Sequence, residues 1–274
     1  MTRSERLSKS ELLDRVVESV YRCGWNALFL ERNESKIPFL IHIYNHNESF
    51  NLRVYIWNIT HGGGDARARD EFRIQITGTR KFERDSNERA IILGWRENDE
   101  IFVGFDFEKH TKRLGASPSF QIREAYLRDA HLYGISFCPK DNKEIAVAFR
   151  PEFFIEYVRN IQEYHAFGRN IKDLKAIQTV ASDPSVSFKS IESVSNLERR
   201  RVIVSLKKTI RDNSFRDRVM TAYSHKCAFC GMQLDLVEAA HILPVSVPKS
   251  TDETGNGIAM CALHHKAYDN PNYS

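Results

Sequence analysis

Two pairs of potential metal ligands near the C-terminus constrain the fold of this chain more than any other feature. Cys227 and Cys230 are separated by two residues, Cys261 and His264 repeat that spacing, and thirty residues lie between the pairs. Thiolate sulfur and imidazole nitrogen are the ligands that zinc prefers, and a two-residue spacer lets a tight turn aim both donors at one ion. We therefore predict a closed, tetrahedral, structural Zn²⁺ site, the alternative being small buried apolar side chains.

The cysteine usage and the composition agree with this prediction. Three of the five cysteines belong to the two pairs, and Cys23 and Cys138 lie far from them, a clustering that favours metal binding over disulfides. No stretch reaches the roughly 18 apolar residues of a membrane helix, and no apolar signal-peptide core follows the N-terminus. We expect a cytoplasmic protein with no membrane partner. The net charge of +4 permits a nucleic-acid partner without requiring one.

Several motifs surround the two pairs in a fixed order. They are RVMTAYSHKCAFCG at 218–231, AAHILP at 239–244, NG at 256–257 and CALHHKAYD at 261–269. In these motifs the C-terminal region resembles the HNH endonuclease family, in its restriction-type form with a ββα-metal fold, from about Cys227 to Asp269. The resemblance implies an enzyme that hydrolyses phosphodiester bonds of DNA with the help of a divalent metal ion.

The resemblance also implies a role for each matching residue. His241 would be the general base that deprotonates the attacking water, and imidazole suits this role because it titrates near neutral pH. Asn256 would brace the loop and hold His241 in orientation through hydrogen bonds. His265 would bind the catalytic ion, Mg²⁺ or Mn²⁺, and Asp269 could be a second ligand because it lies one helical turn later. The zinc would be structural, because so short a module has a small core.

One position departs from the family pattern. Many members place a metal-binding Asp or His directly before the general base, where this chain has Ala240. Glu238 is nearby but, on a strand, would face away from His241. This departure and the end of the chain soon after Asp269 leave open an HNH fold that binds DNA without cutting it. An RNA-cleaving toxin is a further alternative, and a homodimer is also left open.

The region before the HNH motifs has the pattern of a mixed domain, so the predicted fold class is α+β. Ser8 and Glu11 have capping-box spacing ahead of a helical apolar repeat. Residues 39–44, 50–60, 71–77, 90–95, 101–107 and 145–150 read as strands, and 117–121 reads as a turn leading into a helix at 123–133. A further helix follows Pro151. The flanking helices and the β-rich centre faintly resemble the DNA-recognition domains of some restriction enzymes.

These patterns divide the chain into three parts. We predict a DNA-recognition domain at 1–178, a Ser-rich linker at 179–196, and a basic helix followed by the HNH module at 197–274. Trp57 and Trp95 could stack on a flipped base, although a place in the core is the more ordinary role for tryptophan. Arg and Gln pair with base edges and Lys and Arg with phosphates. The candidate DNA-binding residues are Arg67, Arg69, Arg73, Gln75, Gln121, Arg123, Lys207, Lys208 and Arg211.

Overall fold

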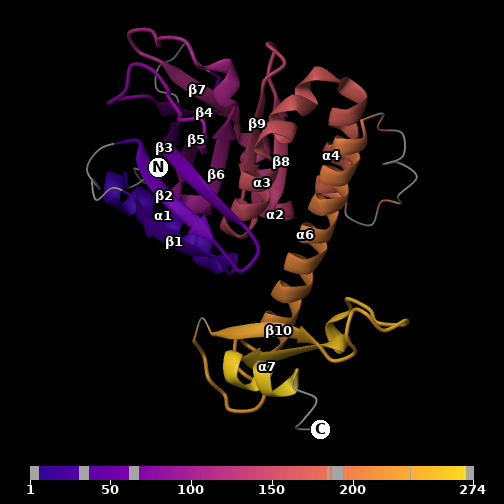
Figure 1. Cartoon of the computed structure of the whole chain (residues 1–274). Coiled ribbons are helices and arrows are strands. Elements are labelled where there is room, and N and C mark those ends of the chain that lie inside the picture. Colours follow the sequence, from indigo (N-terminus) through magenta and orange to yellow (C-terminus); the bar gives the residue numbers. More distant parts are fainter. Residues whose placement is uncertain are drawn as a thin grey trace. The chain divides into compact units, whose positions relative to one another are not determined.

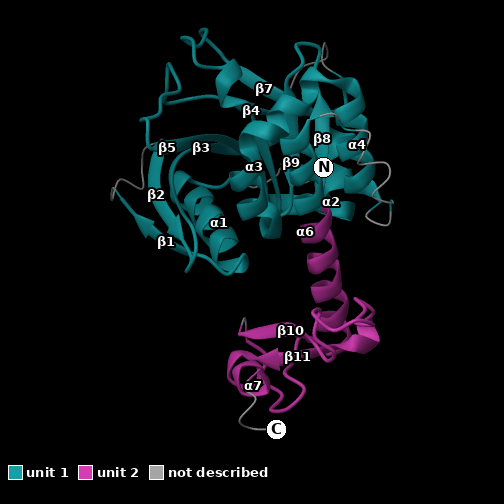
Figure 2. Cartoon of the chain, turned by 45° about the vertical axis from the view of Figure 1, so that its right-hand side comes forward, with its two compact units in different colours: residues 1–206 teal, residues 207–274 magenta. Residues whose placement is uncertain are grey.

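The chain separates into two compact units, residues 1–206 and 207–274, coloured teal and magenta in Figure 2. The division falls inside a long helix, α6 (Leu197–Ala222), whose first turns belong to the N-terminal unit. The computed structural model describes residues 6–30, 37–61, 68–183, 186, 194, 196–234 and 236–269. Among these, no helix combines the length and the apolar character needed to cross a bilayer.

A nine-stranded sheet forms the centre of the N-terminal unit, as far as the described residues show (Figure 1). Seven strands form the main path β1-β2-β3-β5-β6-β9-β8, and β4 and β7 form a branch that starts from β3. Only the pairing of β3 with β5 is parallel among the described pairs. The strands are β1 (Asn26–Phe29), β2 (Phe39–Tyr44), β3 (Ser49–His61), β4 (Glu71–Gln75), β5 (Glu88–Arg96), β6 (Ile101–Phe105), β7 (Ser119–Arg123), β8 (Ile135–Pro139) and β9 (Ile145–Phe149).

The branch of the sheet is a two-stranded ribbon, here called the β4–β7 ribbon. The end of β3 pairs with β4, and β4 pairs antiparallel with β7. The ribbon packs closely over β5 at Gly94, where an added Cβ would lie 2.5 Å from Ile59 Cγ1 and 2.7 Å from Ile74 Cγ2. Glycine is therefore required at this position by the close approach of two strands.

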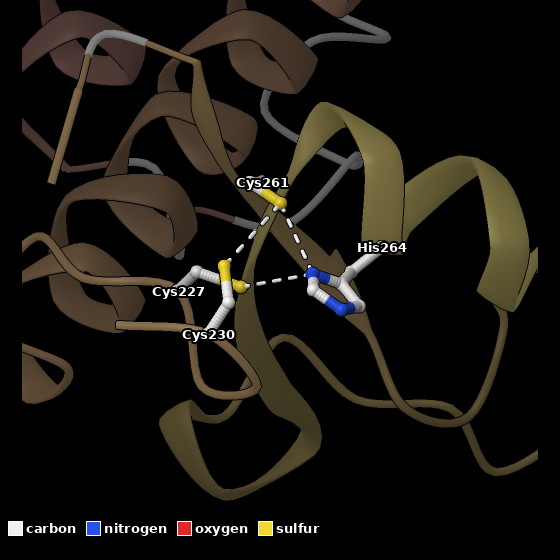
Figure 3. A group of neighbouring side chains, drawn as sticks. All are labelled: Cys227, Cys230, Cys261 and His264. Atoms are coloured by element: carbon white, nitrogen blue, oxygen red, sulfur yellow. Dashed lines mark hydrogen bonds between the residues drawn. The ribbon is translucent and has the colours of Figure 1, made fainter. Parts of the chain in front are cut away.

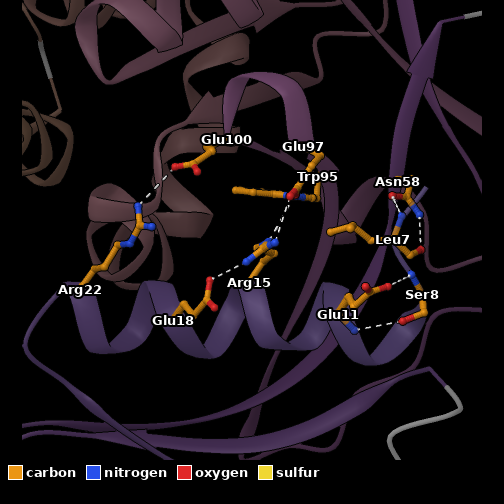
Figure 4. A network of polar contacts seen from close by, with 10 residues as sticks. All are labelled: Leu7, Ser8, Glu11, Arg15, Glu18, Arg22, Asn58, Trp95, Glu97 and Glu100. Atoms are coloured by element: carbon orange, nitrogen blue, oxygen red, sulfur yellow. Dashed lines mark hydrogen bonds and ion pairs between the residues drawn. The ribbon is translucent and has the colours of Figure 1, made fainter. Parts of the chain in front are cut away.

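In the described part of this unit, the start of α6 is accompanied by helices α1 (Lys9–Arg22), α2 (Glu124–Tyr133), α3 (Phe154–Ala166) and α4 (Ile171–Ser182). Short 3₁₀ turns lie at Glu97–Asp99, Phe107–Lys109, Pro151–Phe153 and Phe167–Arg169. Helix α1 begins with the predicted capping box, because Ser8 accepts from the Glu11 N–H and the Glu11 carboxylate accepts from the Ser8 N–H. Arg15 then binds Glu97 through two nitrogens, at 2.9 and 3.3 Å, and so ties α1 to the end of β5 (Figure 4).

The start of α6 is anchored within the N-terminal unit by a buried ion pair. Arg199 Nη1 lies 2.6 Å from Asp173 Oδ2 on α4, and the Asp173 side chain is only 2% exposed. Ser205 donates to Glu156 of α3 over 3.1 Å. The first turns of α6 therefore belong to the helical layer of this unit.

The C-terminal unit has the order strand, strand, helix. Strands β10 (Val237–His241) and β11 (Gly257–Cys261) pair antiparallel, with His241 opposite Gly257, and α7 (Ala262–Tyr268) follows directly. A 3₁₀ turn, Thr254–Asn256, precedes β11. The core is small and includes residues of α6, both strands and the cysteine turn: Phe215, Val219, Met220, Cys227, Val237, Ala259 and Cys261.

Most of the expected elements are confirmed, with a few differences. The prediction of a turn at 117–121 is wrong in part. Residues Ser119–Arg123 form strand β7, because buried Phe120 and Ile122 alternate with polar neighbours. Strands β1 and β8 and helix α4 were not predicted. Helix α4 runs to Ser182, into the segment expected to be linker, because its apolar side chains Val180 and Ala181 are still buried there. Within that segment, residues 184–185, 187–193 and 195 lie outside the described residues.

Candidate functional site

The four predicted zinc ligands converge on one point, as Figure 3 shows. Their ligand atoms all lie within 4.8 Å of one another. Cys230 Sγ lies 3.8 Å from Cys261 Sγ, and His264 Nδ1 lies 3.1 Å from Cys261 Sγ and 3.6 Å from Cys227 Sγ. Two sulfurs bound at about 2.3 Å to one tetrahedral ion would be about 3.8 Å apart. The donor set and its spacing therefore fit a structural zinc ion.

Local backbone structure creates this arrangement. The Gly231 N–H donates to Cys227 O, and Gly231 has a φ of +70°, which glycine adopts without strain and which closes the tight turn. The Ala228 N–H donates to Ala259 O and so fixes the turn to β11. Cys261 ends β11 and His264 lies in the first turn of α7, so the strand–helix junction supplies the second pair.

The surroundings of two of the three sulfurs favour the thiolate form that binds metal. Burial raises the pKa of the Cys227 thiol, but donation from the backbone N–H groups of Cys230, Cys261 and Phe229 outweighs it and lowers the pKa to about 6. The backbone N–H of His264 likewise lowers the pKa of Cys261. Cys227 and Cys261 are therefore shifted toward the thiolate form. For Cys230, the Met232 backbone N–H lowers the pKa, but burial and the neighbouring thiols of Cys227 and Cys261 outweigh it and raise the pKa.

The predicted general base, His241, lies at the end of β10. Its ring stacks on Phe215 of α6, with 3.9 Å between centroids and 7° between planes. Its Nε2 lies 2.9 Å from Asp252 Oδ1, and the side chain is 19% exposed. Since Nε2 is hydrogen-bonded to Asp252, Nδ1 is the ring nitrogen that can accept a proton. Neither Phe215 nor Asp252 was singled out from the sequence.

Asn256 holds the irregular loop between β10 and β11. Its Oδ1 accepts from the Leu243 N–H at 2.8 Å, and its Nδ2 donates to Thr251 O at 2.8 Å and to Leu243 O at 3.2 Å. These bonds join the two ends of the loop that carries Asp252. The described contacts of Asn256 are with the loop and not with the His241 ring.

The two residues expected to bind the catalytic ion lie together on α7. His265 Nε2 is 3.5 Å from Asp269 Oδ2, while His265 Nδ1 is 2.8 Å from Glu238 Oε2 of β10. Two ligands bound at about 2.1 Å and at a right angle to one ion would be about 3 Å apart, so a small rotation would let both atoms bind the same ion. Metal-binding histidines usually donate their second ring N–H to a carboxylate, which is where Glu238 lies.

Fewer side chains are placed to bind a catalytic ion than to bind the structural zinc ion. In the described part of the chain, the zinc set is the only group of three or more His, Cys, Asp or Glu ligand atoms with suitable mutual spacing. Ala240, in the position where many family members carry a ligand, is 6% exposed. Glu238 and Ala240 are on one face of β10, and His241 is on the other. Because Glu238 faces α7, it contacts His265 and not His241.

The predicted DNA-binding residues fall into two groups. In the N-terminal unit, Arg73 of β4 lies opposite Gln121 of β7, and Gln75 lies opposite Ser119. The β4–β7 ribbon thus brings together on one face polar residues that are far apart in sequence. Gln75 donates to Ser117 and Pro118, and Arg123 pairs with Asp70 at 2.8 Å. Arg69 is exposed beside the ribbon, and Arg67 lies outside the described residues.

The second group lies on α6 in the C-terminal unit. Lys208 and Arg211 are exposed and Lys207 is partly exposed. Arg211 Nε lies 2.8 Å from Asp252 Oδ2, so its guanidinium is next to the carboxylate that holds His241.

The tryptophans are core residues. Trp57 is 7% exposed and packs beside Tyr55 and Phe82, and Trp95 is 2% exposed with its ring 4.4 Å from that of Phe102. Stacking on a flipped base would need an accessible ring, so the core role is confirmed for both.

Comparison with known proteins identifies two segments. Residues 227–273 match the family model described as HNH endonuclease, and residues 50–158 match the model described as Methylase-associated X1. No curated protein and no solved structure is significantly similar to the chain. The first match covers both zinc-ligand pairs, His241, Asn256 and His265; the second covers both strands of the β4–β7 ribbon. The C-terminal region of this chain is therefore an HNH endonuclease-family module, and residues 50–158 are similar to the methylase-associated family.

Proposed function

We propose that the chain is a metal-dependent DNA endonuclease of a restriction or defence system. The observation that carries the proposal is the position of His241, held at its Nε2 at the end of β10 within the segment that matches the HNH endonuclease model. The match of residues 50–158 to a methylase-associated model supports the restriction context. The N-terminal unit, residues 1–206, is large enough to supply target recognition.

In the proposed reaction, His241 accepts a proton from the attacking water at Nδ1. The water oxygen forms a bond to phosphorus while the bond to the 3′-oxygen breaks, and the leaving oxygen takes a proton from solvent. His265 Nε2 and Asp269 would hold the catalytic Mg²⁺ or Mn²⁺, and Glu238 would orient the His265 ring through Nδ1. Bound there, the ion would offset negative charge on the phosphate oxygens.

The zinc set would have a structural role in this enzyme. Cys227, Cys230, Cys261 and His264 would supply all four ligands of a tetrahedral zinc ion and would leave no open position for substrate. With the ion bound, this set would join the turn at Cys227 to the junction of β11 and α7, and so would fix α7 relative to the strands.

For target recognition, we propose the polar face of the β4–β7 ribbon. A two-stranded ribbon fits the major groove, and arginine and glutamine side chains pair with guanine and adenine edges. Arg73, Gln75, Gln121 and Arg123 would contact bases, with Arg69 on the backbone. Lys207, Lys208 and Arg211 of α6 would contact phosphates near the scissile bond.

The test is cleavage of plasmid DNA, modified and unmodified, by the wild type and by His241→Ala with Mg²⁺ or Mn²⁺. We expect the wild type to cut, the variant to lose at least about 10²-fold in rate, and end-sequencing to give the target. Zinc content and thermal unfolding serve as controls for the fold. A zinc-loaded, folded wild type that cuts no DNA substrate with either ion would overturn the proposal.

A second function, DNA binding without cleavage, is favoured by one observation. Ala240 stands where a metal ligand is usual, so among the described residues of the module only His265 and Asp269 are placed to hold the ion. This function predicts salt-dependent DNA binding and the same absence of cleavage in the wild type and in His241→Ala. The plasmid assay therefore separates the two functions.

A further inference from the structure

The acidic residue next to the proposed general base points to an additional part of the active site. Asp252 Oδ1 lies 2.9 Å from His241 Nε2, across eleven residues of sequence. We propose that Asp252 is a positioning residue, which fixes the His241 ring and keeps its proton on Nε2 so that Nδ1 is free to act as the base. This inference rests on the proposed nuclease function and adds a residue to it.

The chemistry of the pair decides which ring nitrogen carries the proton. An ionised carboxylate can only accept hydrogen bonds, so Nε2 of a neutral His241 must donate to it. The remaining nitrogen, Nδ1, then has its lone pair available. After His241 has taken a proton, the imidazolium still donates from Nε2 to Asp252, and the carboxylate stabilises its positive charge.

Asp252 is itself held on several sides. Its second carboxylate oxygen lies 2.8 Å from Arg211 Nε, and Arg218 Nη2 donates to its backbone carbonyl over 2.6 Å. Both arginines lie on α6, which also provides Phe215 beneath the His241 ring. One helix therefore positions both the histidine and the carboxylate that orients it.

The loop that carries Asp252 is closed by Asn256, which bonds to Leu243 at one end and to Thr251 at the other. Asn256 thus acts on His241 through the loop. The Asp212 carboxylate on α6 is close enough to interact electrostatically with Asp252 and His241, and burial raises its pKa. The charged groups of α6 and the loop near His241 therefore include Asp252, Arg211, Arg218, Asp212 and Lys208.

The variants that test the inference are Asp252→Asn, which removes the charge, and Asp252→Glu, which keeps it. The matched control is Glu253→Gln, which neutralises an exposed carboxylate at the next position in the loop. We expect Asp252→Asn to lower kcat by roughly 10²- to 10⁴-fold with KM for DNA little changed, Asp252→Glu to recover part of the loss, and the control to match wild type. In a His241→Ala background, Asp252→Asn should have no further effect.

A spectroscopic measurement separates positioning from a merely structural role. The ¹⁵N shifts of the His241 ring, measured without DNA, should report the Nε2-protonated form in wild type and a mixture of tautomers in Asp252→Asn. Wild-type protonation at Nδ1, or a kcat of Asp252→Asn equal to that of the control, would overturn the inference while leaving the nuclease function standing. A wild type that cuts no DNA would instead overturn the nuclease function, and this inference with it.

Discussion

Substitution of Gly257 tests whether α6 packs against the β-hairpin as closely as the structure indicates. Gly257 begins β11 opposite His241, and an added Cβ would lie 2.1 Å from Val219 Cγ2 and 3.0 Å from Phe215 Cζ. Carbon atoms in contact prefer about 3.5–4.0 Å, so Gly257→Ala would force a separation of about 1.4 Å or more at Val219. Alanine adopts the φ of −116° found at Gly257 without backbone strain, so the loss of stability comes from the steric clash alone.

Overpacking of this kind costs about 1–3 kcal/mol. In a unit of this size, 1 kcal/mol corresponds to a shift of about 4–8 °C in melting temperature. We therefore expect Gly257→Ala to lower the melting temperature of the C-terminal unit by at least about 4 °C. Because Phe215 also stacks on His241, we expect cleavage to fall as well.

Calorimetry of the full chain measures this change, and tryptophan fluorescence provides an internal reference. All three tryptophans lie in residues 1–206, so their fluorescence reports the unfolding of the N-terminal unit, which should stay unchanged. Gly255→Ala is the matched control, because an added Cβ there has no atom within 4 Å. The double variant Val219→Ala with Gly257→Ala should be less unstable than the sum of the single variants, because the clashing methyl is gone. Equal melting temperatures for Gly257→Ala and Gly255→Ala would refute the packing.

Further predictions concern the zinc set and a buried carboxylate. Cys261→Ser should unfold the C-terminal unit and reduce bound zinc, measured by elemental analysis, from one ion per chain to none. The control variant Cys23→Ser should keep the zinc. Retention of zinc by Cys261→Ser would count against the site. Burial raises the pKa of the Glu144 carboxyl, but hydrogen bonds from His110 and Asn142 and the charge of Lys140 outweigh it and lower the pKa to about 2. The stabilisation from this carboxylate is therefore present above about pH 4.5 and is lost as the pH falls toward 2. Glu144→Gln should lower the free energy of unfolding of the N-terminal unit at pH 7, measured by tryptophan fluorescence in denaturant. The difference in unfolding free energy between wild type and variant should shrink as the pH falls. A difference that stays constant with pH would show that the charge of Glu144 is not the reason.

Local patterns in the sequence were sufficient for much of the fold. The capping box at Ser8, the strand that begins at Glu71 and the helix after Pro151 are confirmed, because each depends on the pattern of one short segment. The short strands β1 and β8 were missed, since four or five residues carry little periodic signal. Strand β7 was read as a turn because Pro118 and neighbouring serines are typical of turns, while its pairing with β4 is long-range.

The sequence by itself determined which residues could form the zinc set and where the HNH motifs lie, because both depend on spacing along a short stretch of chain. Only the tertiary structure decided the partners of those residues. His241 meets Asp252 across an irregular loop, His265 meets Glu238 across 27 residues, and Arg73 lies opposite Gln121 through strand pairing. Such contacts depend on how loops close and how elements pack, and neither periodicity nor spacing encodes those geometries.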